Sequence, residues 1–300
     1  MKKNILTKLF HLFFADPTRK KAENVILYIA LISFFIHLGL IYLLKLELIQ
    51  LPIASEFFNN PISAVYTPFS FILIYEVYLL IYYLPRSFTT YIVKQYEIIT
   101  LIIIRRLFKD LSALELTSNW FEIKGDLQFT YDLVASLVLF FLILIFHKQT
   151  RKKAINTPKV KPEIQRFVDK KKIIAVVLLP LFFGIALFTL VDWSSEIFSN
   201  NASLEPYKSI NNLFFDQFFT VLILVDVVLL LLSFFYTDQF HKIIRNSGFI
   251  ISTILIRMSF GVNGLISTIL ILTAVLFGLA IISIHNNYEK HDLPADVDSE

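Results

Sequence analysis

The chain is dominated by apolar runs that are long enough to cross a membrane as helices. A hydrocarbon core about 30 Å thick requires roughly 20 residues of apolar helix. Eight such runs occur within the 300 residues. A segment inside lipid must satisfy its own backbone hydrogen bonds, so each run predicts a helix. The runs cover residues 24–44, 62–84, 88–107, 127–146, 173–193, 213–236, 248–260 and 265–284.

Two of the eight runs depart from this pattern. The run 88–107 carries Lys94 and Glu97, and the run 248–260 reaches spanning length only if its helix starts near Lys242. The sequence still favours an all-α integral membrane protein with about eight transmembrane helices.

Composition excludes several classes of protein. Hydrophobic residues make up 56% of the chain and charged residues only 17%, which exceeds the apolar content of ordinary globular domains. A soluble enzyme and a nucleic-acid-binding domain are therefore excluded. Cysteine is absent, so disulfides, thiolate catalysis and cysteine-bound metals are excluded as well.

The basic residues predict the orientation in the membrane. Lys and Arg favour the cytoplasmic side, and they cluster before the first run and in the linker 148–172. The N-terminal segment 1–23 has an apolar face and a lysine face, which predicts an interfacial amphipathic helix. An even number of spans returns the acidic tail 286–300, predicted to be disordered, to the cytoplasm. We expect a multi-pass protein of the cytoplasmic (inner) membrane whose basic segments contact anionic lipid and not nucleic acid.

The two halves of the chain show weak self-similarity. A shift of 150 residues places Glu76 on Asp226, and a shift of 151 places Lys94 on Arg245 and Arg106 on Arg257. Each half then has an acid within its second helix and two bases within its third. This predicts two parallel four-helix repeats, 24–147 and 173–285, related by an axis along the membrane normal.

The charges inside the runs are the candidate functional residues. Charged groups within a span are costly and usually have partners. In a helical hairpin that turns at Pro85, residues 76 and 94 lie at one depth, so Glu76 is predicted to pair with Lys94, with Glu97 as a second acid. Asp226 is predicted to pair with Arg245 by the same argument. The full candidate network is Glu76, Lys94, Glu97, Arg106, Asp226, Arg245 and Arg257.

Two functions remain open at this point. The leading hypothesis is that the charges serve ion or proton movement, as in a channel or transporter, with Glu76 and Asp226 as the acids that a cation must pass. The alternative is a non-conducting scaffold or sensor subunit whose basic cytoplasmic loop docks a partner. An enzyme is not expected, because no P-loop, dinucleotide, HExxH or GxSxG motif occurs and glycine is scarce. No catalytic residue, cofactor or metal site is predicted, and a homo-oligomer or a partner subunit remains open.

Overall fold

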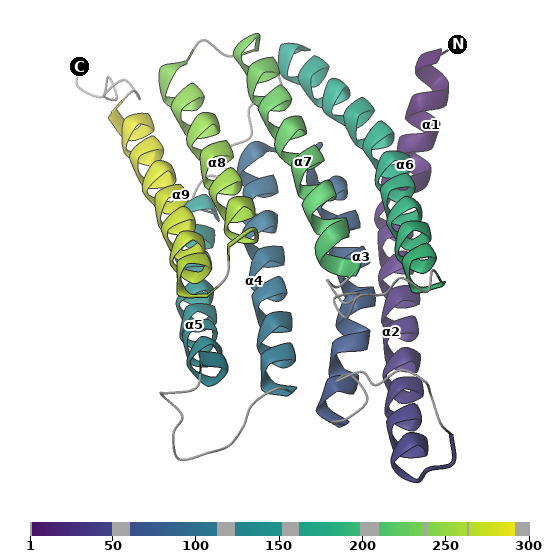
Figure 1. Ribbon diagram of the computed structural model, residues 1–300. Coiled ribbons are helices and arrows are strands. Elements are labelled where there is room, and N and C mark those ends of the chain that lie inside the picture. Colours follow the sequence, from purple (N-terminus) through teal and green to yellow (C-terminus); the bar gives the residue numbers. More distant parts are fainter. Residues whose placement is uncertain are drawn as a thin grey trace, which may run out of the picture. The chain divides into compact units, whose positions relative to one another are not determined.

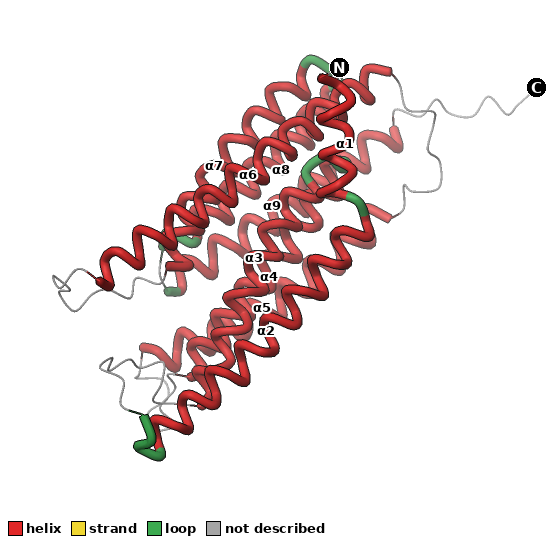
Figure 2. Tube along the Cα trace, turned by 90° about the vertical axis from the view of Figure 1, so that its right-hand side faces the viewer, coloured by secondary structure: helices red, strands yellow, loops and turns green. Residues whose placement is uncertain are grey.

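A computed structural model describes residues 2–49, 61–112, 124–151, 162–198, 210–236, 239–262 and 264–291. Every regular element within these ranges is a helix and none is a strand (Figures 1 and 2). The prediction of an all-α protein is therefore confirmed for the described residues. The elements are α1 (Lys2–Phe14), α2 (Asp16–Lys45), the 3-10 helix η2 (Pro61–Val65), α3 (Tyr66–Tyr83), α4 (Phe88–Ser112), α5 (Lys124–Arg151), α6 (Pro162–Phe198), α7 (Ile210–Phe234), α8 (Phe240–Ser259) and α9 (Leu265–His291).

Six of these segments are long and apolar enough to cross a membrane: Asp16–Lys45, Pro61–Tyr83, Leu127–Thr150, Ile164–Phe188, Gln217–Phe234 and Leu265–Lys290. Their outward surfaces carry large apolar side chains that a soluble protein would bury. Phe35, Phe141, Phe183 and Phe188 are each more than 60% exposed. The chain is therefore suited to embedding in a membrane.

The other two predicted spans correspond to α4 and α8. Both are helical, but each carries more charge than a lipid-facing segment tolerates, with Lys94, Glu97 and Arg106 on α4 and Arg245 and Arg257 on α8. Residues such as Gln95 on α4 and Asn246 on α8 are buried within the protein. A topology with eight spans remains a prediction. Among the described helices, six segments are long and apolar enough to span a membrane.

The chain divides into two compact units. Unit 1 comprises residues 1–82 and 97–138, and unit 2 comprises residues 83–96 and 139–300. The boundaries pass through α4 and α5, so they differ from the predicted halves 24–147 and 173–285. The internal duplication stays a prediction.

Unit 1 ties its N-terminal helices to α3 through three tyrosines. Residue Ala15, in extended backbone, separates α1 from α2, and Pro17 lies in the first turn of α2, where proline is well tolerated. On α3, Tyr75 donates a hydrogen bond to Glu23 (2.9 Å), Tyr78 donates to the carbonyl of Phe13 (2.7 Å) and Tyr82 donates to Asp16. The tyrosine hydroxyls thus hold both sides of the junction at Ala15.

Unit 2 is built around α8. This helix packs against α7 and most extensively against α9, and α6 packs against α7 (Figure 1). Close approach requires a glycine on α9, because a Cβ at Gly278 would lie 1.8 Å from the hydroxyl oxygen of Tyr96. That hydroxyl is bonded to Ser252 on α8 at 2.6 Å. A small residue thus lets α4, α8 and α9 meet.

Two helices of unit 2 are longer than the sequence predicts. Helix α6 begins at Pro162, so the last part of the predicted basic linker 148–172 is helical, whereas residues 152–161 lie outside the described residues. Helix α9 continues to His291, so residues 286–291 of the predicted disordered tail are in fact helical. The i to i+4 hydrogen bonds of α9 continue past residue 284 because neither proline nor glycine occurs between there and Pro294. Residues 292–300 lie outside the described residues.

Candidate functional site

A charged cluster lies inside unit 2, where Asp226 of α7 meets Arg257 in the last turn of α8. The carboxylate of Asp226 lies 2.7 Å from the guanidinium of Arg257, and the two side chains are 0% and 3% exposed. Tyr91 donates a hydrogen bond to Asp226 Oδ1 at 3.0 Å, and Arg257 donates to Gln95 Oε1 at 3.1 Å. We call Tyr91, Gln95, Asp226 and Arg257 the ionic cluster. It joins the first half of α4 to α7 and α8.

A second cation lies near the ionic cluster. Lys171 on α6 is 1% exposed, and its charge interacts with Asp226. Its ammonium donates to the carbonyl of Arg86 at 2.7 Å and lies 4.5 Å from the ring centre of Phe88. These contacts replace part of the hydration that a buried ammonium loses. Lys171 therefore anchors α6 to the loop before α4.

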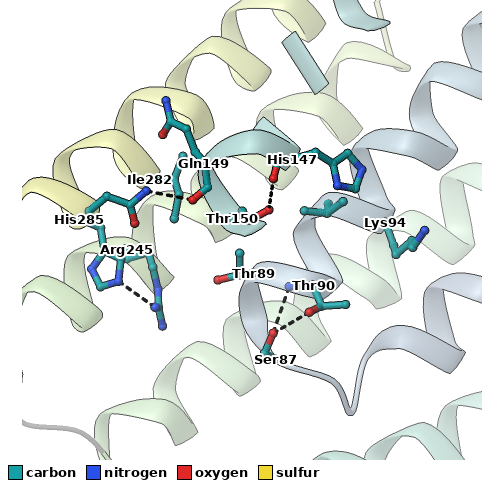
Figure 3. Close-up of a pocket in the computed structure, with 12 residues that line it drawn as sticks. Ser87, Thr89, Thr90, Lys94, His147, Gln149, Thr150, Arg245, Ile282 and His285 are labelled. Atoms are coloured by element: carbon teal, nitrogen blue, oxygen red, sulfur yellow. Dashed lines mark hydrogen bonds between the residues drawn. The ribbon is translucent and has the colours of Figure 1, made fainter. Parts of the chain in front are cut away.

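A polar pocket of about 380 Å³ opens elsewhere in unit 2 (Figure 3). It lies between the start of α4, the end of α5, the start of α8 and the last turns of α9. We call it the basic pocket, because its lining includes two cations and two histidines but no acidic residue. Its lining residues are Ser87, Thr89, Thr90, Val93, Lys94, His147, Gln149, Thr150, Arg245, Ile282, His285 and Asn286.

The walls of the basic pocket are held in place by hydrogen bonds between helices. Ser283 of α9 donates to Gln149 Oε1 at 2.9 Å, and Asn286 donates to the carbonyl of Gln149 at 3.3 Å. The hydroxyl of Ser87 accepts a hydrogen bond from the backbone N–H of Thr90 at 3.2 Å, which caps the start of α4. The pocket walls are thus built from ordered helix ends.

Arg245 occupies one side of the basic pocket. Its Nη2 donates to Asn246 Oδ1 at 3.0 Å, and its Nη1 lies 3.0 Å from Nε2 of His285. Among the residues that the structure describes, no carboxylate lies within ion-pair distance of this guanidinium. Lys94 lies on the opposite side in Figure 3, with Thr89, Thr90 and Thr150 between the two cations.

No family model matches this chain, and no curated protein or solved structure matches it significantly. The function must therefore be argued from the geometry alone.

Three side chains beside the basic pocket could also hold a metal ion. One nitrogen each of His241 and His285 and one oxygen of Glu289 lie within 4.8 Å of one another, and nitrogen and carboxylate ligands suit zinc and related cations. Arg245 argues against this use, because its positive charge lies 3.0 Å from the His285 nitrogen that would bind the ion. We therefore do not assign a metal to this trio.

The structure changes one predicted ion pair and leaves another untested. The predicted pair of Asp226 with Arg245 is wrong, because Asp226 binds Arg257 and Arg245 contacts Asn246 and His285. Equal distance from a helical turn gives depth but not the direction in which a side chain points. The pair of Glu76 with Lys94 would join unit 1 to unit 2, so it stays a prediction, as does a role for Glu97.

The two predicted repeat positions on α4 and α8 have different partners. Arg106 contacts Asp132 on α5 at 2.6 Å, and Asp132 is 0% exposed, whereas Arg257 contacts Asp226 on the preceding helix α7. Glu76 in unit 1 is 5% exposed and interacts electrostatically with Arg105. Within the two units the structure therefore pairs Arg106 with Asp132 and Arg257 with Asp226.

Sequence reasoning missed several residues of these sites. Tyr91 and Gln95 are uncharged and lie within an apolar run, so nothing in the sequence distinguishes them from packing residues. Lys171 belongs to the basic linker, whose charges predict only the orientation in the membrane. One local signal was present for the basic pocket, because His285 and Glu289 are spaced i, i+4 and share a helix face. In the structure His285 Nε2 lies 3.1 Å from Glu289 Oε1.

Proposed function

We propose that this chain is a non-conducting membrane scaffold or sensor subunit. The observation that supports this proposal is the complete burial of the Asp226 and Arg257 pair, at 0% and 3% exposure. A cation path requires fixed negative charge that a passing ion can reach. In the ionic cluster both oxygens of Asp226 are engaged, one by Tyr91 and one by Arg257.

The ionic cluster has the properties of a structural lock. Each of its members lies on a different turn of α4, α7 or α8, and the hydrogen-bonded contacts run between helices. Separating these helices would leave an aspartate and an arginine uncompensated in a medium of low dielectric constant. The proposal therefore assigns the cluster to holding the helices of unit 2 in one arrangement.

A scaffold needs a surface for its partner. Besides the buried Lys171, the basic linker 148–172 supplies nine Lys and Arg residues in a short segment, which suits an acidic partner or an anionic membrane surface. The proposal places partner docking at this linker, on the cytoplasmic side of the predicted topology.

The proposal is tested by reconstituting the purified chain in liposomes that contain a pH dye or a potassium dye. We expect no flux above that of empty liposomes, both for the natural chain and for Asp226→Asn. A protonophore or valinomycin added at the end verifies that the vesicles hold a gradient. Flux by the natural chain above that of empty liposomes would overturn the proposal, and its loss in Asp226→Asn would place the ion path at the ionic cluster.

A second candidate function is proton movement through unit 1. It is favoured by Glu76, which is 5% exposed and has no ion pair within 4 Å among the described residues, its electrostatic partner being Arg105. The same liposome assay separates the candidates: proton flux that Glu76→Gln abolishes and that the exposed control Glu47→Gln leaves intact would favour proton transport.

A further inference from the structure

We propose that the basic pocket binds a phosphate group that carries two negative charges, as in inorganic phosphate or a phosphate monoester. This inference goes beyond the proposed function and holds whether or not the chain conducts ions.

The lining of the basic pocket carries positive charge and no negative charge. The pocket lining contains Lys94, Arg245 and two histidines and no Asp or Glu. Arg245 is the critical cation, because no carboxylate among the described residues lies within ion-pair distance of it. Glu289 Oε1 lies 3.1 Å from His285 Nε2, the same nitrogen that Arg245 Nη1 approaches to 3.0 Å. A dianion bound in the pocket would supply negative charge close to Arg245.

The basic pocket also contains hydrogen-bond donors of the kind that bind phosphate. Arginine has a planar fork of N–H groups that matches phosphate oxygens, and lysine adds a compact charge. In the view of Figure 3 Thr89 lies between the two cations, whereas the hydroxyls of Thr90 and Thr150 are bonded to Ser87 and to the carbonyl of His147. The start of the 25-residue helix α4 adds the positive end of its dipole. A phosphate with three free oxygens can use more of these donors than a carboxylate with two.

The size and the position of the basic pocket also suit a phosphate compound. A volume of about 380 Å³ falls within the range of small-molecule pockets and leaves room for the group esterified to the phosphate. The pocket is lined by helix ends that the predicted topology places on the cytoplasmic side. The phosphate can therefore come from the cytosol or from the headgroup of a lipid such as phosphatidic acid.

The test uses the full chain in detergent and in lipid nanodiscs. Titration with inorganic phosphate is followed by calorimetry, and thermal unfolding is compared in nanodiscs that contain phosphatidic acid or phosphatidylglycerol. The variants are Arg245→Gln and the control Lys148→Gln, which also loses one positive charge but is exposed and outside the lining.

Saturable binding of inorganic phosphate that Arg245→Gln weakens about tenfold or more, with less than twofold change for Lys148→Gln, supports the proposal with a soluble ligand. Stabilisation by phosphatidic acid but not by phosphatidylglycerol, lost in Arg245→Gln, supports it with a lipid ligand. No binding in either system overturns the proposal. Equal weakening by both variants, or an equal response to both lipids, also overturns it, because it indicates non-specific attraction of anions.

Arg245→Gln is first checked for folding by gel filtration and thermal unfolding. If that variant does not fold, Thr89→Val provides the test, because it removes one pocket hydroxyl and keeps the branched shape. Weaker phosphate binding by Thr89→Val supports the proposal, and unchanged binding overturns it.

Discussion

At the scale of single residues, the ionic cluster illustrates why charge can persist inside an apolar bundle. Asp226 and Arg257 are completely buried, and their cost is offset by each other and by Tyr91 and Gln95. Removal of one member of a buried pair is more damaging than removal of both, because the remaining charge has neither water nor a partner.

We therefore expect Asp226→Asn and Arg257→Gln each to destabilise the chain by about 3 to 5 kcal/mol, as in soluble proteins, or by less where water defects relieve the charge. The double variant is expected to recover part of this loss. Unfolding in detergent measures both effects. The matched control is the surface pair of Asp169 and Lys172, whose side chains are 46% and 35% exposed; its neutralisation should shift stability by less than about 1 kcal/mol. Additive losses in the double variant would contradict the assignment.

At the scale of secondary-structure elements, α4 and α8 behave differently from the other long helices. Both carry several charged residues and bury polar side chains such as Gln95 and Asn246, and they also expose apolar side chains such as Leu101 and Met258. The N-terminal helices depend on α3 in a comparable way, because polar contacts and not only apolar packing hold them. Tyr75, Tyr78 and Tyr82 present their hydroxyls on one face of α3, spaced by three and four residues.

Removal of these three hydroxyls should loosen the junction of α1 and α2. Each hydrogen bond contributes about 0.5 to 1.5 kcal/mol, so the triple variant Tyr75→Phe, Tyr78→Phe, Tyr82→Phe should open the junction on the order of tenfold or more often. Limited trypsin digestion at Lys20 and Lys21, followed by mass spectrometry, measures this opening. The control is Tyr28→Phe, because Tyr28 is 68% exposed. Equal cleavage rates in all variants would show that the rings alone hold the junction.

At the scale of the whole molecule, the distribution of basic residues predicts which side of the membrane each loop occupies. The ten Lys and Arg residues of the linker 148–172 should keep that linker in the cytoplasm. The loop that contains Asn201 should then lie outside. Both loops include residues beyond the described ranges, so labelling is the direct measure.

The absence of cysteine makes this labelling simple. A single cysteine at Ile155 should not react with an impermeant maleimide in intact cells, and a single cysteine at Ala202 should react. Permeabilised cells provide the control, in which both positions become reactive. The reverse pattern in intact cells would invert the predicted topology and move the basic pocket to the outer side.

The sequence by itself determined the helical, membrane-embedded character of this protein, because hydropathy and helix length are local properties of consecutive residues. It also determined that charges such as Asp226 and Arg257 would need partners. Only the tertiary structure decided that Asp226 meets Arg257 and not Arg245, because pairing depends on helix rotation and on contacts between residues more than 30 positions apart. The same reason hid the basic pocket, whose walls come from four helices and whose parts have no common spacing along the chain.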